Sequence, residues 1–195
     1  MMSRSAETSR ETRETKVRVA LELDGSGRSS VSTGVGFLDH LLGSLAHHAL
    51  FDLEIEATGD LEVDDHHIVE DVALVLGEAI AHALGDRSGI TRFGDAVVPM
   101  DEATARASVD AGGRPFAVIE LELRNERIGN LTTQNLPHAL EALCRASGIT
   151  LHLEAMGAND HHIAEAAFKA LARSLRGAVE IDPRRQGIPS TKGVL

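Results

Sequence analysis

The chain has 195 residues, with 19 Lys and Arg against 30 Asp and Glu, a formal charge of −11, one Cys and no Trp or Tyr. Its single Cys144 excludes an internal disulfide, and the acidic balance with few stacking aromatics argues against a nucleic-acid partner. No apolar run approaches the roughly 20 residues that span a bilayer, and no segment resembles a secretion signal. We therefore expect a cytoplasmic protein without membrane contact. Ten His, six of them in adjacent pairs, are the unusual feature.

The first part of the chain alternates between strand and helix patterns. Residues 1–12 are polar and lack periodicity, so we expect a flexible N-terminus there. Beyond it, alternating apolar residues around an Asp-Gly turn predict a hairpin. The predicted elements are strands at 17–23 and through Val31, a helix at 37–45, a strand at 51–55 and a helix at 68–83. They give the order β-β-α-β-α.

The second part repeats this plan. FDLEIEA at 51–57 matches ITLHLEA at 149–155, an offset of 98, and DHHIVE at 65–70 matches DHHIAE at 160–165, an offset of 95. Such an internal repeat predicts two copies of one unit. We therefore expect an α+β fold in which each half is a mixed sheet with two helices on one face, and the helices of the two halves pack back to back. The predicted halves are 13–90 and 91–195, within one compact domain and with a boundary over 89–98.

Paired histidines begin the predicted helix of each repeated motif. Glu70 lies four residues after His66 and three after His67, so its carboxylate can share an ion with either imidazole. Adjacent helical residues lie about 100° apart around the axis, so we expect the two His to serve different ions. The second copy offers the same set, and two further His are related by the offset of 98. The candidate ligands, three His and one Glu for each of two metals, are His40, His66, His67, Glu70, His138, His161, His162 and Glu165.

Imidazole and carboxylate donors without thiolate suit Zn, Mn, Fe, Co or Ni, whereas Mg and Ca prefer oxygen ligands. The alternative is that both motifs only cap and solvate helix N-termini, with Asp65 and Asp160 as N-caps. Two copies at matched positions favour the metal site. We interpret His47, His82 and His152 as surface or packed side chains.

The last third of the chain concentrates cationic groups despite the negative total. Residues 187–193 combine hydroxyls, backbone N–H groups and the Lys192 ammonium in a loop shaped by Gly and Pro, and such groups suit a phosphate. Arg92 and Arg114 are further candidates, because guanidinium groups match phosphate oxygens. A solvated basic surface is the alternative, and it is weakest for Ser190 and Lys192. These groups predict a small phosphorylated substrate.

Several longer segments carry a family likeness. They are FLDHLL at 37–42, DDHHIVEDVALVLGEA at 64–79, RFG at 92–94 with VPMDEA at 98–103, GGRPF at 112–116, PHALEAL at 137–143, HHIAEAAFKA at 161–170 and PSTKGVL at 189–195. Together they resemble the imidazoleglycerol-phosphate dehydratases of histidine biosynthesis, in their monofunctional form. The likeness runs from about Glu14 to Leu195 and implies a fold like that of ribosomal protein S5 domain 2.

The resemblance implies a carbon–oxygen lyase that removes water from D-erythro-imidazole-glycerol phosphate and yields imidazole-acetol phosphate. It implies two Mn²⁺ per active site, held by the same eight ligands, and a 24-subunit shell with sites between subunits. Glu14 is the candidate acid–base group, with Glu165 or a metal-bound water as the runner-up. The implied substrate contacts are Glu14, His48, Arg92, Arg114, Lys169, Ser190, Thr191 and Lys192. Ser44 and Glu62 depart from the family pattern, and neither is a proposed ligand.

The chemistry of such a substrate explains the need for metals. The C–H bond to be broken has no neighbouring carbonyl, so the imidazole must supply the activation. Metals on the ring nitrogens favour imidazolate, which expels hydroxide and leaves a diazafulvene-like intermediate with an acidified C–H. Two other functions stay open from the residues alone. A dinuclear phosphoester hydrolase would release phosphate, and a non-catalytic metal-binding protein would change its oligomer size with metal and consume no substrate.

Overall fold

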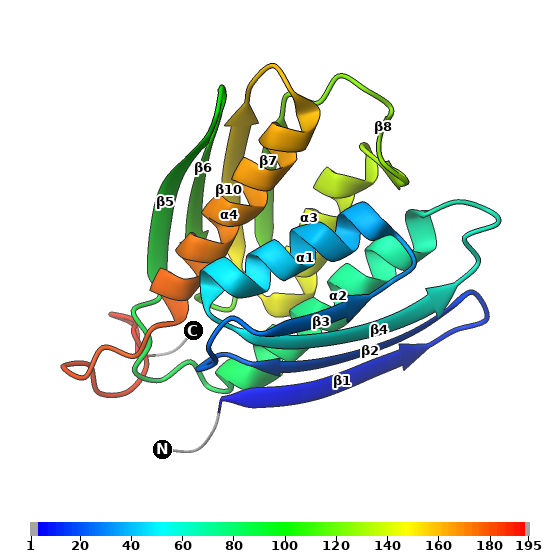
Figure 1. Ribbon diagram of the computed structural model, residues 1–195. Coiled ribbons are helices and arrows are strands. Elements are labelled where there is room, and N and C mark those ends of the chain that lie inside the picture. Colours follow the sequence, from blue (N-terminus) through cyan, green and yellow to red (C-terminus); the bar gives the residue numbers. More distant parts are fainter. Residues whose placement is uncertain (1–3, 194–195) are drawn as a thin grey trace.

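Two sheets enclose a double layer of helices in this protein. The computed structural model describes residues 4–193, and within them two four-stranded sheets lie on the outside with four helices between them (Figure 1). The predicted α+β fold, with mixed sheets and helices packed back to back, is confirmed. None of the helices described here is both long enough and apolar enough to cross a bilayer.

The first sheet has the strand order β1-β2-β4-β3. Strand β2 is antiparallel to both β1 and β4, whereas β3 is parallel to β4. The elements of this half are β1 (Ser5–Glu11), β2 (Thr15–Glu22), β3 (Ser29–Ser32), α1 (Gly36–Ala49), β4 (Asp52–Gly59) and α2 (His66–Leu84).

The second sheet has the equivalent order β5-β6-β10-β7. Strand β6 is antiparallel to β5 and β10, and β7 is parallel to β10. The elements are β5 (Phe93–Met100), β6 (Ala103–Asp110), β7 (Phe116–Leu121), α3 (Asn135–Ser147), β10 (Thr150–Met156) and α4 (Asp160–Val179). A small hairpin of β8 (Arg127–Ile128) and β9 (Leu131–Thr132) precedes α3 and has no counterpart in the first half.

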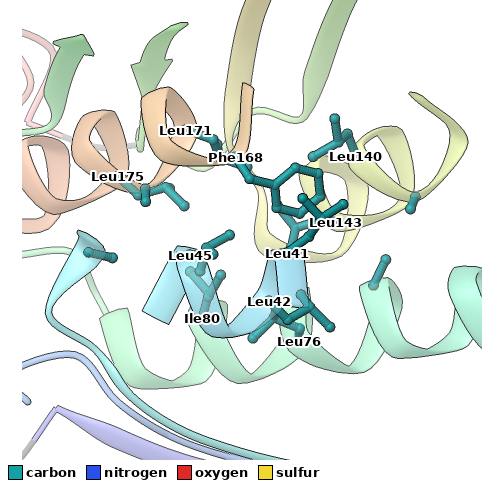
Figure 2. Packing of buried hydrophobic residues seen from close by; sticks show 14 of the residues in the cluster. Leu41, Leu42, Leu45, Leu76, Ile80, Leu140, Leu143, Phe168, Leu171 and Leu175 are labelled. Atoms are coloured by element: carbon teal, nitrogen blue, oxygen red, sulfur yellow. The ribbon is translucent and has the colours of Figure 1, made fainter. Parts of the chain in front are cut away.

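The core is formed by apolar residues that recur with a period of two in the strands and of about 3.6 in the helices. In β2, Val17, Val19 and Leu21 are buried and alternate with more exposed residues, as expected for a strand with one face toward helices. Between the sheets, α2 packs on α3 and α1 on α4. Figure 2 shows the side chains that fill this helical interior, among them Leu41, Leu45, Leu76, Ile80, Leu140, Leu143, Phe168, Leu171 and Leu175. Complete burial of each such side chain contributes about 1.5–3 kcal/mol to folding.

The expected hairpin at the start of the first sheet is wrong. Strand β4 lies between β2 and β3, so the two strands on either side of the Asp-Gly turn are not neighbours. Instead β3 pairs parallel with β4, and a parallel pair needs a crossover, which α1 provides. Asp52 stabilises the loop between β2 and β3, because its carboxylate accepts hydrogen bonds from the backbone N–H groups of Ser26 and Arg28.

The expected flexible N-terminus over 1–12 is also wrong for the described residues, because Ser5–Glu11 form edge strand β1. An edge strand with a solvent-facing side needs few apolar residues, so a polar sequence concealed it. Thr8 is buried and donates its hydroxyl to Val75 O of α2. In the second half, residues 93–98 of the expected boundary belong to the equivalent edge strand β5. Residues 1–3 of the predicted flexible segment lie outside the described residues.

Candidate metal centre

Cluster A, defined as His40, His161 and Glu165, joins α1 to the first turns of α4. His40 Nε2 and His161 Nε2 each lie 2.9 Å from Glu165 Oε1. Lys169, one turn later, donates to Glu165 Oε2. Burial raises the pKa of the Glu165 carboxyl, but hydrogen bonds from Lys169, His40 and His161 outweigh this and lower the pKa to about 2. Cluster A therefore presents an ionised carboxylate between two imidazoles.

Cluster B, defined as His66, Glu70 and His138, joins α2 to α3. Glu70 Oε1 lies 3.4 Å from His138 Nε2, and Glu70 Oε2 lies 3.8 Å from His66 Nε2. The two imidazole rings stack with centroids 4.9 Å apart. His138 Nε2 is buried and, within residues 4–193, has no hydrogen-bond partner. Arg145 Nη2 approaches Glu70 Oε1 at 3.3 Å from an exposed position.

Both clusters fit a divalent transition-metal ion. In each, one ligand atom per residue can be chosen so that all three lie within 4.8 Å of one another. Two ligand atoms about 2.1 Å from one ion lie about 3–3.5 Å apart at the usual angles, close to the separations found here. His138 Nε2 is buried and makes no hydrogen bond in the described residues, and coordination to a metal ion would satisfy this nitrogen. The donors are nitrogen and oxygen only, as predicted.

The second histidine of each motif lies outside these clusters. His67 Nδ1 is 3.0 Å from Asp60 Oδ2, and His162 Nδ1 is 2.8 Å from Glu102 Oε2. These carboxylates raise the pKa of both imidazoles. A carboxylate on Nδ1 orients the ring and leaves Nε2 for another partner, as in many metal-bound histidines. One chain therefore provides two His and one Glu per cluster instead of the predicted three His.

Three supporting residues were missed by sequence reasoning. Asp60 directly follows β4, Glu102 belongs to the turn between β5 and β6, and Asn135 begins α3. Glu102 also accepts hydrogen bonds from the N–H groups of Ala158 and Asn159. Each contact joins residues from different elements, so no local spacing could reveal it.

The side chains of the motif aspartates do not cap the helices, as the alternative to a metal site required. Asp65 accepts hydrogen bonds from the N–H and hydroxyl of Thr132 in β9, and its side chain makes no capping bond to α2. Asp160 accepts from the N–H groups of Arg124 and Asn125, while the side chain of Asn159 caps α4. Both motif aspartates therefore hold the segment 124–132, which precedes α3, the helix that carries His138.

The predicted phosphate-binding residues lie apart from the clusters on this chain. The tail that carries Ser190, Thr191 and Lys192 follows the C-terminal end of α4, whereas cluster A lies at its start, about 27 Å away along the helix axis. Figure 1 shows the tail, in red, at that end of α4. Arg92 fastens it, because Nη1 donates to Pro189 O at 3.0 Å while the same guanidinium binds Asp110.

The remaining predicted site residues divide between the two regions. Arg114 is exposed, with Nη2 3.7 Å from the carboxylate of Asp110 beside Arg92. Glu14 is exposed, with Oε2 3.9 Å from His67 Nδ1. His48 lies in the last turn of α1, where burial and then electrostatic repulsion from His47 and Lys169 lower its pKa. Lys169, whose charge acts on His48, also donates a hydrogen bond to Glu165 of cluster A.

Comparisons with known proteins identify the family of this chain. The family model described as Imidazoleglycerol-phosphate dehydratase matches residues 33–175. A relative of that name from Methanothermobacter thermautotrophicus is 57% identical over 194 residues, covering 100% of this chain and 98% of the relative. Another, from Azorhizobium caulinodans, is 55% identical and covers 98% of each chain.

Solved structures show the same likeness. A crystal structure titled as imidazoleglycerol-phosphate dehydratase from Staphylococcus aureus superposes with a TM-score of 0.82 at 32% identity, covering 91% of this chain and 99% of the other. One from Pyrococcus furiosus, in complex with (S)-C348, gives 0.82 at 35% identity, covering 96% and 99%. With its doubled DHHxxE motif, its two clusters and these relatives, the chain belongs to the imidazoleglycerol-phosphate dehydratase family.

Proposed function

We propose that clusters A and B are the metal centre for this chain's reaction, the dehydration of imidazoleglycerol phosphate in histidine biosynthesis. The activity follows from the family, in which the chain is a hydro-lyase, and we expect it to act in the cytoplasm as a biosynthetic enzyme. The observation that carries the metal assignment is the pair of imidazole–carboxylate clusters, one with a buried, unpartnered ligand nitrogen. The product would be imidazole-acetol phosphate.

The donors support Mn²⁺ as the ion, with two per active site. Imidazole with carboxylate and no thiolate suits this metal among others, and the family resemblance favours it. Bound there, the ions would stabilise the substrate's imidazole as an anion, which activates the neighbouring carbon atoms for loss of water. His40, His161 and Glu165 would hold one ion, and His66, Glu70 and His138 the other.

Glu14 is our choice for the group that moves the proton. Its carboxylate is exposed beside His67, where a substrate can approach it. In Glu165, the runner-up, both oxygens already accept hydrogen bonds from His40, His161 and Lys169. A positioned carboxylate typically accelerates proton transfer by about 10²–10⁴-fold.

The separation of the tail from the clusters supports an active site shared between subunits. Ser190 and Lys192 follow the C-terminal end of α4, whereas cluster A of the same chain lies at its N-terminal end. We propose assembly into a 24-subunit shell in which the tail, Arg92, Arg114 and Lys169 gather around the substrate phosphate. The Nε2 atoms of His67 and His162, oriented by Asp60 and Glu102, would complete the clusters of neighbouring chains.

One assay tests the proposal. Metal-free protein is supplied with Mn²⁺ and imidazoleglycerol phosphate, and ketone product and released phosphate are followed with and without chelator. We expect metal-dependent ketone formation without phosphate release. The His66→Ala variant should lose activity, whereas His82→Ala, an exposed His on the same helix, should retain it. Phosphate release, or the absence of metal-dependent product, would overturn the proposal.

A further inference from the structure

One difference between the two clusters lies at a pair of equivalent positions in α1 and α3. Phe37 lies three residues before His40 in α1, and Asn135 lies three residues before His138 in α3. The offset of 98 that relates the two His therefore also relates Phe37 to Asn135. One cluster has a phenyl ring where the other has an amide.

In cluster B the Asn135 amide orients His66, one of the proposed metal ligands. Asn135 Oδ1 lies 3.1 Å from His66 Nδ1, and Asn135 is 4% exposed. Because the amide oxygen only accepts hydrogen bonds, this contact orients the His66 ring through Nδ1 and leaves Nε2, which faces Glu70, for an ion. His138 Nε2 lies 3.4 Å from Glu70 Oε1 and makes no hydrogen bond. An ion entering cluster B therefore displaces one hydrogen bond to Glu70, the 3.3 Å bond from the exposed Arg145 side chain.

In cluster A the surroundings differ. The Phe37 ring centroid lies 4.8 Å from that of His161 and 6.0 Å from that of His40. Within residues 4–193, His161 Nδ1 has no hydrogen-bond acceptor to fix its tautomer. Both imidazoles bond to Glu165 Oε1, and Lys169 bonds to Oε2. An ion entering cluster A must displace these bonds and compete with the Lys169 ammonium for the carboxylate.

We infer that the two clusters are inequivalent metal sites, in which cluster B binds its ion first and more tightly because Asn135 positions His66. This inference rests on the proposed metal centre. Loss of a hydrogen bond to a ligating imidazole typically costs 10–100-fold in metal affinity, so the amide alone can separate the sites by about that factor. Asn135 is a positioning residue, since it acts through His66.

Titration of the metal-free full chain with Mn²⁺ alone tests the order of binding, with free Mn²⁺ counted by its electron paramagnetic resonance signal. We expect one tight and one weak ion per chain, separated by at least about tenfold. Glu70→Gln should remove the tight ion and Glu165→Gln the weak one. Two ions of equal affinity would overturn the inference and leave the proposed function standing, whereas absence of Mn²⁺ binding would overturn the proposed function itself.

A matched pair of variants tests the role of Asn135. Asn135→Leu should weaken the tight ion about 10–100-fold, and Asn135→Gln, which keeps the neutral amide, should bind it more tightly than Asn135→Leu does. Phe37→Leu, at the equivalent position, should leave the tight ion unchanged. Circular dichroism identifies any variant that fails to fold, in which case the Asn135→Gln and Phe37→Leu titrations still decide. Tight binding retained by folded Asn135→Leu, or lost equally in Phe37→Leu, would overturn the inference.

Discussion

The imidazole rings of His66 and His138 stack with centroids 4.9 Å apart and planes 19° apart, although they come from opposite halves of the chain. His66 begins α2 in the first half, and His138 lies in α3 of the second. Cluster A has the reverse composition, with His40 from the first half and His161 from the second. Neither half can therefore form a cluster alone, and the back-to-back packing of the helices creates both sites.

The carboxylate of Asp60 should matter through the imidazole that it orients. Asp60→Ala removes the partner of His67 Nδ1, and we expect dehydratase activity and Mn²⁺ affinity to fall about 10–100-fold. Steady-state kinetics and metal titration measure the two effects. The matched control is Glu56→Ala on the exposed face of β4, which should behave like the parent protein. Equal activity of both variants would contradict the role of Asp60.

Close contact between α2 and α3 depends on Gly77. A Cβ at this position would lie 2.7 Å from Leu143 O and 2.7 Å from Ala146 Cβ. Alanine favours a helix by about 1 kcal/mol, but overpacking typically costs about 1–3 kcal/mol, so we expect Gly77→Ala to lower the melting temperature. Gly43→Ala in α1 is the control, because its nearest neighbour, Ser29 Oγ, would be 3.6 Å away. A stabilised Gly77→Ala protein would show that the helices can separate freely.

Acid should remove the stabilising effect of Asp24. The Arg4 guanidinium, whose Nε donates to Asp24 Oδ2 at 2.8 Å, lowers the pKa of this carboxyl below its ordinary value of 3.8. Because the folded pKa is the lower one, the stabilisation is complete above about pH 3.8 and is lost as the pH falls through the folded pKa. Melting curves should show Asp24→Asn less stable than the parent protein near neutral pH, with a gap that narrows in acid.

The control for this series is Asp95→Asn, at an exposed position of β5, which should follow the parent protein at every pH. A gap between Asp24→Asn and the parent protein that stays constant down to pH 3 would contradict the ion pair as the cause.

The only thiol of the chain should be unreactive in the folded protein. Cys144 is 1% exposed, and burial raises the pKa of its thiol to about 12. Since the thiolate is the reactive form, Ellman's reagent at pH 8 should react with it quickly only after unfolding by guanidinium. Rapid modification of the native protein would mean that α3 opens far more readily than its packing indicates.

Local patterns were sufficient for much of the fold. Periods of two and 3.6 residues revealed the buried strands and the two helices of the first half, and the internal repeat extended this plan to the second half. Strands β1 and β5 escaped detection because edge strands bury one face at most and tolerate polar sequence. The false hairpin had a similar origin: a turn signal does not say whether a third strand, here β4, enters between its arms.

For the site, the sequence by itself determined the ligand types, their duplication and the family. Helical spacing placed His66 with Glu70 and His161 with Glu165, because residues four apart share a helix face. Only the tertiary structure decided that His138 joins the first pair and His40 the second, and that Asp60, Glu102 and Asn135 orient the imidazoles. These groupings arise from packing between helices that are distant in sequence. The repeat alone is equally compatible with the opposite assignment of His40 and His138 to the two pairs.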